Sequence, residues 1–147
     1  MKEEKTYYGV IVLFYKGRGE GRGFLVVENS KTGNVTFVSG TQEAEDRDLL
    51  ATAQREIKEE LGLDSNSYQL EPTDVYHNFV YGSKKPERTG RRGSNQLFLV
   101  NASALGEIGH TSELKRVMWL SKEEVGQKLT FSDLKKVFEQ AVKERKW

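Results

Sequence analysis

The sequence predicts a layered α/β (α+β) sandwich in which helices cover a mixed β-sheet. Three observations predict this fold. Strand-like runs and glycine-containing turns fill the first forty residues, a helical repeat of apolar side chains follows them, and two more helical segments stand near the C-terminal end. The 147 residues match the usual size of one domain and contain no internal repeat or linker. We therefore expect a single domain over residues 1–147.

The predicted strands begin at residues 6–15, where TYYGVIVLFY is continuously apolar and rich in aromatic and β-branched side chains. Such a run is typical of a strand that is buried on both faces. After the glycine-rich turn KGRGEGRG, residues 24–27 and 35–38 predict two more strands, and the three together predict an antiparallel meander. Later strand-like segments occupy residues 75–81, 96–100 and 116–120.

Residues 48–61 change from the strand period to a helical one. Apolar side chains recur on one face, and the adjoining face carries polar and acidic ones; the apolar set is Leu50, Ala53, Ile57 and Leu61, and the polar set is Thr52, Glu56, Glu59 and Glu60. Gly62 stands where a helix C-cap glycine belongs. The segment therefore predicts an amphipathic helix packed on the sheet.

Two further helices are predicted from their caps. Ser121 and Glu124 have the spacing of a capping box. Ser132 can cap the segment DLKKVFEQAVKERKW, whose apolar face consists of Leu134, Val137, Phe138 and Ala141.

Composition excludes several classes of function. With 23 Lys and Arg against 22 Asp and Glu, the chain lacks the overall charge of a nucleic-acid coat protein. It has no cysteine, so any metal must be bound by oxygen atoms or by His77 and His110. No apolar run is long enough for a membrane span, and MKEEKTYYG lacks the apolar core of a signal peptide. We expect a cytoplasmic protein with no membrane partner.

The stretch REIKEELGL places Glu56, Glu59 and Glu60 on neighbouring positions of the predicted helix. Like charges three or four residues apart destabilise a helix by roughly 0.2–0.5 kcal/mol per pair, so a compensating partner is expected. One interpretation is a divalent cation such as Mg²⁺ or Mn²⁺, which prefers oxygen ligands and is usually shared with substrate phosphates. The other is a solvated acidic face, partly neutralised by Arg55 and Lys58.

The larger pattern around these acids resembles the Nudix box. The residues from Arg55 to Leu63 match every specified position in the second half of the box, and Gly40 follows a predicted strand as the motif requires. The first half departs from the pattern, because the loop TQEAEDRD carries one extra residue and Val38-Ser39-Gly40 replaces Pro-Gly-Gly. Glu45 and Asp46 are the available substitutes for the first glutamate of the box. The resemblance covers essentially the whole chain and implies the Nudix α/β/α sandwich with a mixed sheet.

The resemblance also implies roles for individual residues. Glu56 and Glu60 would be the main metal ligands, with Glu59 assisting and the carbonyl oxygen of Gly40 completing the set. Arg55 would orient the glutamates. The implied reaction is hydrolysis of a diphosphate linkage with Mg²⁺, or Mn²⁺, as the cofactor. A general base is also required, and two residues are candidates for it: Glu59 and Glu113, the latter six residues before Trp119.

The order of residues is similar to Nudix enzymes that act on dihydroneopterin triphosphate and deoxynucleoside triphosphates, and then to diadenosine tetraphosphate hydrolases. This similarity implies a pyrophosphohydrolase with a small nucleotide substrate. Three alternatives remain open: a dinucleoside polyphosphate hydrolase, an RNA 5′-pyrophosphohydrolase, and a nucleotide-binding domain that does not catalyse a reaction.

The segment SKKPERTGRRG predicts a long exposed basic loop between two strands. Its cations could bind a polyphosphate tail or the 5′ end of an RNA; they are Lys84, Lys85, Arg88, Arg91 and Arg92. A mobile solubilising loop is the alternative. A base-stacking platform could also come from strand aromatics, which are otherwise core residues: Tyr7, Phe37, Tyr76, Phe79 and Tyr81.

Overall fold

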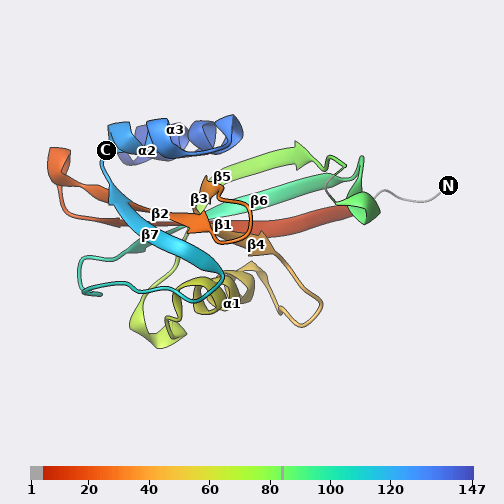
Figure 1. Ribbon diagram of the computed structural model, residues 1–147, viewed down its shortest axis with the longest axis horizontal. Coiled ribbons are helices and arrows are strands. Elements are labelled where there is room, and N and C mark those ends of the chain that lie inside the picture. Colours follow the sequence, from red (N-terminus) through yellow and green to blue (C-terminus); the bar gives the residue numbers. More distant parts are fainter. Residues whose placement is uncertain (1–4, 84) are drawn as a thin grey trace.

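The computed structural model describes residues 5–83 and 85–147. A seven-stranded mixed sheet forms the middle of the molecule (Figure 1). Its strands are β1 (Thr6–Lys16), β2 (Gly23–Asn29), β3 (Val35–Thr36), β4 (Val38–Thr41), β5 (Glu71–Val80), β6 (Arg92–Asn101) and β7 (Leu114–Leu120). The helices are α1 (Leu49–Leu61), α2 (Lys122–Lys128) and α3 (Ser132–Arg145), with short 3₁₀ turns at Gly19–Gly21, Ser65–Ser67 and Pro86–Arg88.

Strand β1 is the centre of the sheet. It pairs in parallel with β6 along ten residues and antiparallel with β4, while β5 and β7 form antiparallel pairs with β6 and β2. The predicted buried strand at residues 6–15 is thereby confirmed, since a strand covered by helices on both faces needs apolar side chains on both.

The predicted antiparallel meander is confirmed in β1, β2 and β3, but its third strand is shorter than expected. Residues 35–38 are divided at Phe37 into β3, which pairs with β2, and β4, which pairs with β1. Phe37 is buried in the core on the α3 side of the sheet. This change of partner places β4 beside α1, which a regular hairpin would not do.

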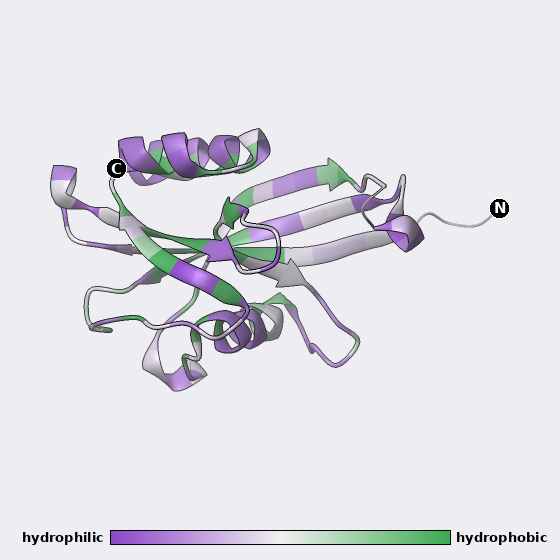
Figure 2. Ribbon diagram, viewed as in Figure 1, coloured by the Kyte–Doolittle hydropathy of each residue, from purple (hydrophilic) through white to green (hydrophobic). Residues whose placement is uncertain are grey.

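Helices cover both faces of the sheet, as predicted: α1 lies on one face, and α2 and α3 lie on the other (Figure 1). Two apolar clusters fill the spaces between the layers. Figure 2 shows hydrophobic residues along the central strands and on the sides of the helices that face the sheet. No helix within the described residues is both long and apolar enough to cross a membrane.

The predicted ends of α1 and α2 are confirmed. Asp48 caps α1 by accepting a hydrogen bond from the Ala51 amide at 2.8 Å, and Gly62 ends the helix with a left-handed φ of 73°. Ser121 and Glu124 form the complete capping box of α2.

Two details of the predicted helices are wrong. Ser132 is the first residue of α3 and does not cap it. The N-cap position is occupied by Phe131, and no side-chain hydrogen bond caps the helix there. On α1, the side chain of Leu50 is 40% exposed, and Thr52 is fully buried in place of a residue from the apolar repeat. The hydroxyl of Thr52 is satisfied by Asp46 at 3.0 Å, which makes its burial inexpensive.

Candidate active site

The acidic face of α1 lies against β4 at Gly40. A Cβ atom added at Gly40 would come within 2.1 Å of the Glu56 carboxyl group, so only glycine allows this approach. The carbonyl oxygen of Gly40 lies beside β1, where a Cβ atom on Gly9 would come within 2.4 Å of it. The predicted glycine of the motif thus sets the distance between strand and helix.

Arg55 links the loop after β4 to the acids of the helix. One terminal nitrogen donates to the carbonyl oxygen of Thr41 and to Asp46, both at 2.9 Å. The other donates to Glu56 at 2.8 Å and to Glu59 at 3.3 Å. The arginine therefore contacts both halves of the motif and holds the two glutamates in place.

Asp46 is the acid that contacts Arg55 from the loop with the extra residue. Its side chain is only 6% exposed, and hydrogen bonds from Arg55 lower the pKa of its carboxyl group to about 2, assisted by the Glu43 amide and the Thr52 hydroxyl. Of the two predicted substitutes for the first glutamate of the motif, Asp46 is thus the one in this network, while Glu45 is exposed.

Glu56 and Glu60 lie together on the buried side of the helix. Glu60 is only 9% exposed and accepts one weak hydrogen bond, from the Ser39 amide at 3.4 Å. Burial raises the pKa of both carboxyl groups well above their usual range, and the charge of Glu56 raises the pKa of Glu60 further. Two buried acids that repel one another form a strong site for a cation.

These two carboxyl groups open onto a cavity of about 240 Å³, called the acidic cavity below. Its lining residues are Val27, Asn29, Thr36, Ser39, Glu56, Glu60, Glu113 and Leu114. Within residues 5–83 and 85–147, no group of three or more acidic or histidine side chains is arranged as a complete metal site. Mg²⁺ does not need one, because it usually keeps several waters and binds one or two carboxylates together with substrate phosphates. The all-oxygen donor set of the cavity therefore fits such an ion.

The two candidates for general base occupy different positions. Glu59 is half exposed and paired with Arg55, whereas Glu113 lines the same cavity as Glu60. The segment before Glu113 is attached to the end of α1, because the Thr111 amide donates to the carbonyl oxygen of Glu60 at 2.9 Å. The structure thus brings a residue from 53 positions beyond Glu60 in the chain to the acidic face of the helix.

A second cavity, of about 480 Å³, adjoins the first and shares Thr36 and Ser39 with it. It lies between the last residues of β5, the first half of β6 and the start of α3. Its lining residues are Ile11, Thr36, Ser39, His77, Phe79, Val80, Tyr81, Gly82, Asn95, Phe131, Asp133 and Leu134. Of the predicted stacking aromatics, Phe79 and Tyr81 line this cavity; Phe37 belongs to the core, and neither Tyr7 nor Tyr76 is in the lining.

Sequence reasoning missed His77, Asn95, Phe131 and Asp133 as parts of this cavity. A signal was present for His77. It is two residues from the buried Val75 and two from Phe79, so the three side chains point to the same face of the strand. No signal in the sequence alone pairs that face with the start of α3.

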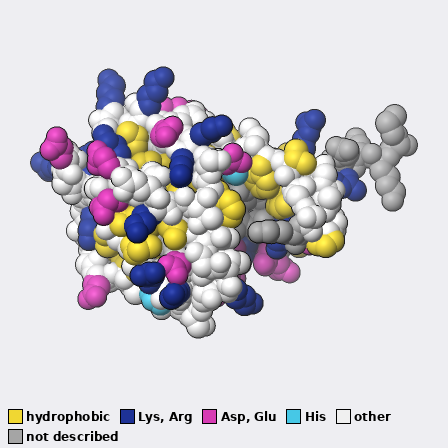
Figure 3. Space-filling view, turned by 45° about the horizontal axis from the view of Figure 1, so that its top comes forward, with side chains coloured by type: hydrophobic (Ala, Val, Ile, Leu, Met, Phe, Trp, Pro, Cys, Tyr) yellow, Lys and Arg dark blue, Asp and Glu magenta, His cyan; other side chains and the backbone are white. Residues whose placement is uncertain are grey.

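The basic loop is held by Arg88. Its guanidinium group lies 4.4 Å from the ring centre of Tyr7 and 5.4 Å from that of Tyr81, and it donates to the Thr41 hydroxyl at 3.4 Å. Lys85 and Arg92 are exposed, Arg91 is partly buried, and Lys84 lies outside the described residues. Phosphate binding by this loop stays a prediction. On the face drawn in Figure 3, basic and acidic side chains are interspersed, without a continuous basic patch.

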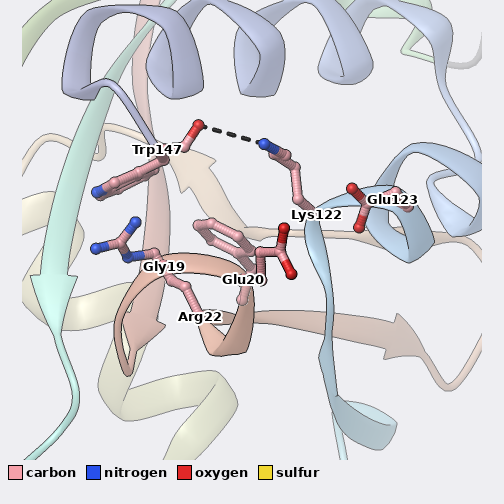
Figure 4. A pocket seen from close by; sticks show the side chains of 7 residues that line it. Gly19, Glu20, Arg22, Lys122, Glu123 and Trp147 are labelled. Carbon is pink, nitrogen blue, oxygen red and sulfur yellow. Dashed lines mark hydrogen bonds between the residues drawn. The ribbon is translucent and has the colours of Figure 1, made fainter.

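A third cavity, of about 560 Å³, lies near the C-terminal end of the described chain, between the β1–β2 turn and α2 (Figure 4). The Trp147 ring closes one side of it, and the Lys122 ammonium donates to the Trp147 carbonyl oxygen at 3.3 Å. Its charged groups are of mixed sign, with Arg22 and Lys122 beside Glu20 and Glu123. It shares no lining residue with the acidic cavity and lacks a pair of buried carboxylates.

Comparison with known proteins agrees with this geometry. The family model described as NUDIX domain matches residues 5–141. No curated protein matches the sequence. Solved structures do match in fold: an Ap4A hydrolase binary complex of C. elegans has 17% sequence identity and a TM-score of 0.76, with 95% of this chain and 98% of that chain covered.

Two further structures have the same fold. The dihydroneopterin triphosphate pyrophosphohydrolase of E. coli has 19% identity and a TM-score of 0.74, covering 90% of this chain and 92% of that chain. The NUDIX domain of Shewanella oneidensis NrtR, complexed with ADP ribose, has 16% identity and a TM-score of 0.72, covering 99% of this chain and 91% of that chain.

Proposed function

The chain belongs to the NUDIX domain family, and from this premise we propose that it is a Mg²⁺-dependent pyrophosphohydrolase acting on a nucleoside polyphosphate or a related nucleotide derivative. The observation that carries the proposal is the pair formed by Glu60, which is buried, and Glu56, whose side chain is 13% exposed; both open onto the acidic cavity. A protein gains nothing in stability from two buried carboxylates with raised pKa values, so their burial indicates a functional role.

Glu56 and Glu60 would hold the cation, with Mn²⁺ able to replace Mg²⁺ because both accept oxygen ligands. When bound, the ion would activate water and neutralise charge that develops on the phosphate oxygens. Arg55 positions Glu56 through its 2.8 Å hydrogen bond and keeps Glu59 directed along the same face of α1.

We assign the general base to Glu113 in preference to Glu59. Glu59 is paired with Arg55 at 3.3 Å and does not line the cavity onto which Glu56 and Glu60 open. Glu113 lines the cavity itself and reaches it from a loop fixed to the end of α1, so it can accept a proton from water bound between it and the substrate.

The adjoining cavity would hold the heterocycle while the phosphates extend to the acids. The two cavities share Thr36 and Ser39, and the second has aromatic walls at Phe79 and Phe131. The proposal includes one domain over residues 1–147 and the cytoplasmic location expected from the sequence.

One observation favours a second candidate function, a domain that binds nucleotides without cleaving them. Glu59, the third acid of the motif, is paired with Arg55 and does not line the cavity onto which Glu56 and Glu60 open. One of the similar folds, the NUDIX domain of NrtR, was crystallised with ADP ribose.

Product analysis separates the two. Nucleoside triphosphates, dihydroneopterin triphosphate, dinucleoside polyphosphates and triphosphorylated RNA are incubated with Mg²⁺ and either the wild type or Glu60→Gln, and the products are resolved by ion-exchange chromatography. Cleavage by the wild type alone supports the enzyme and identifies the scissile bond. Tight nucleotide binding without any product supports the non-catalytic domain and overturns the hydrolase.

A further inference from the structure

We propose that Asp133 makes the second cavity selective for a heterocycle with two adjacent N–H donors, as in the edge of a ring N–H and a neighbouring amino group that guanine and pterin share. This inference rests on the proposed function, because it assumes that a nucleotide or nucleotide-like heterocycle occupies the cavity. It adds a residue that chooses the heterocycle.

The walls of the cavity suit a flat aromatic ring. Phe79 and Phe131 contribute aromatic surface, and Phe131 is 43% exposed although it is a large apolar side chain. The volume of about 480 Å³ is within the range of roughly 300–1,000 Å³ that is usual for small-molecule sites. An aromatic ligand would cover apolar surface that now contacts water.

Asp133 is the only carboxylate among the described residues that line this cavity. It lies in the first turn of α3, and its side chain is 61% exposed, so both oxygens can be reached by a ligand. Burial of a ligand against this group would remove water from the carboxylate, and the loss must be replaced by hydrogen-bond donors.

The His77 side chain lies next to Asp133 in the cavity lining. Its Nε2 atom is 3.6 Å from a carboxylate oxygen of Asp133, which is too long for a hydrogen bond, and neither ring nitrogen has a hydrogen-bond partner in the structure. The imidazole is held flat against Phe79, at 4.9 Å between ring centres and 25° between planes. A small rotation of Asp133 would bring one of its oxygens into hydrogen-bond range of His77, and both oxygens would keep lone pairs for a ligand.

The chemistry of the common heterocycles then gives the selectivity. A carboxylate accepts two parallel hydrogen bonds from the N1–H and the 2-amino group of guanine, or from the equivalent edge of a pterin. Adenine and cytosine place an acceptor nitrogen beside their amino group, and uracil flanks its single N–H with two carbonyl oxygens. Each of these would face Asp133 with a lone pair and would be repelled.

Asn95 adds a second polar group to the same cavity. Its side chain lies over Gly9, since a Cβ atom there would come within 2.5 Å of the Asn95 oxygen. The carbonyl oxygen of Gly40 approaches the same point of β1, so the Asn95 side chain lies close to the glycine of the motif.

The test measures binding, by calorimetry, of methylene-bridged triphosphate analogues that cannot be hydrolysed. Guanosine, inosine and adenosine analogues are compared on the wild type, on Asp133→Asn, and on Glu139→Gln, which changes an exposed acid of α3 that is not part of the cavity lining. We expect the guanosine analogue to bind at least about tenfold more tightly than the inosine analogue, which lacks the 2-amino group.

We expect Asp133→Asn to abolish this preference and Glu139→Gln to preserve it. Dihydroneopterin triphosphate, measured under the same conditions in Ca²⁺ to suppress turnover, distinguishes a pterin from a guanine nucleotide as the better ligand. Equal affinity for the three nucleosides in the wild type, or an unchanged preference in Asp133→Asn, would overturn the role of Asp133. A preserved preference without hydrolysis of any substrate would overturn only the proposed enzyme.

Discussion

Asp46, in the loop before α1, and Glu60, in α1 itself, both have largely buried carboxyl groups, yet their surroundings shift the two pKa values in opposite directions. Asp46 accepts hydrogen bonds from Arg55, the Glu43 amide and Thr52, and its pKa is lowered to about 2. Glu60 has one long hydrogen bond and a neighbouring glutamate, and its pKa is raised. Asp46 therefore belongs to the framework and Glu60 is available to a cation, since of the two only Glu60 has no cationic partner among the described residues.

Replacement of Glu60 should give the largest effect on activity. Glu60→Gln keeps the shape of the side chain but removes one of the two charges proposed to hold the metal, so hydrolysis should fall by at least about 100-fold. Because a buried, repelled carboxylate disappears, the melting temperature without metal should stay equal or rise. Steady-state kinetics and calorimetry check both. Full activity in the variant would contradict the role of Glu60 in holding the metal.

Gly40→Ala should reduce activity and stability together. Its new methyl group would meet the Glu56 carboxyl at 2.1 Å, so strand and helix must separate, at a cost of about 1–3 kcal/mol in the free energy of unfolding. We expect at least a tenfold loss of hydrolysis, measured beside urea unfolding. Gly109→Ala is the control, because no atom lies within 4 Å of a Cβ atom there.

Asp46→Asn should change stability in the opposite direction from Glu60→Gln and destabilise the protein. It removes the charge that binds Arg55, and loss of hydrogen bonds between ionised groups should lower the free energy of unfolding by about 2 kcal/mol. Glu43→Gln changes an exposed partner 3.5 Å from the same arginine and should change stability by less than about 0.5 kcal/mol. Chemical denaturation compares the two; equal effects would show that Asp46 is not a special partner.

The pH dependence of stability should separate the two acids. Asp46 has a lowered pKa, so its contribution is present above the ordinary aspartate value and is lost as pH falls toward about 2. Glu60 has a raised pKa, so the metal-free protein should lose stability as pH rises from about 5 through the raised value. Thermal unfolding in EDTA should show this decline, and Mg²⁺ or Glu60→Gln should reduce it. A flat profile in EDTA would be evidence against the burial of charge at Glu60.

Arg88→Ala should have the smallest effect. The arginine contacts two tyrosine rings and the Thr41 hydroxyl, so we expect a loss of about 1 kcal/mol in stability. Arg92→Ala, which changes an exposed side chain of the same region, should be close to neutral. Thermal unfolding of both variants is the measurement, and equal melting temperatures would remove the structural role of Arg88.

The sequence predicted the parts of the fold that depend on local chemistry. The helix from Leu49 to Leu61, its glycine cap and the capping box at Ser121 follow from periodicity and from side chains that bond to nearby backbone. The switch of partner at Phe37 could not be predicted, because pairing of β4 with β1 depends on a non-local register.

The candidate site divides in the same way. The acids of α1 were predictable because they are close together in one motif, and Asp46 was one of two alternatives within a single loop. His77 and Asp133 are 56 positions apart in the sequence, and the contact between their side chains depends on how α3 packs across β5. Side chains that meet only through such packing leave no spacing in the sequence that could have paired them.

Direct measurement of Mn²⁺ binding tests most closely whether Glu56 and Glu60 form a cation site. Equilibrium binding is followed by the electron paramagnetic resonance signal of free Mn²⁺ for the wild type, Glu60→Gln and Glu43→Gln, with no nucleotide present. We expect saturable binding to the wild type and to Glu43→Gln, with affinity at least about tenfold lower in Glu60→Gln. Equal affinity in all three proteins would contradict it and would place any metal of this protein elsewhere.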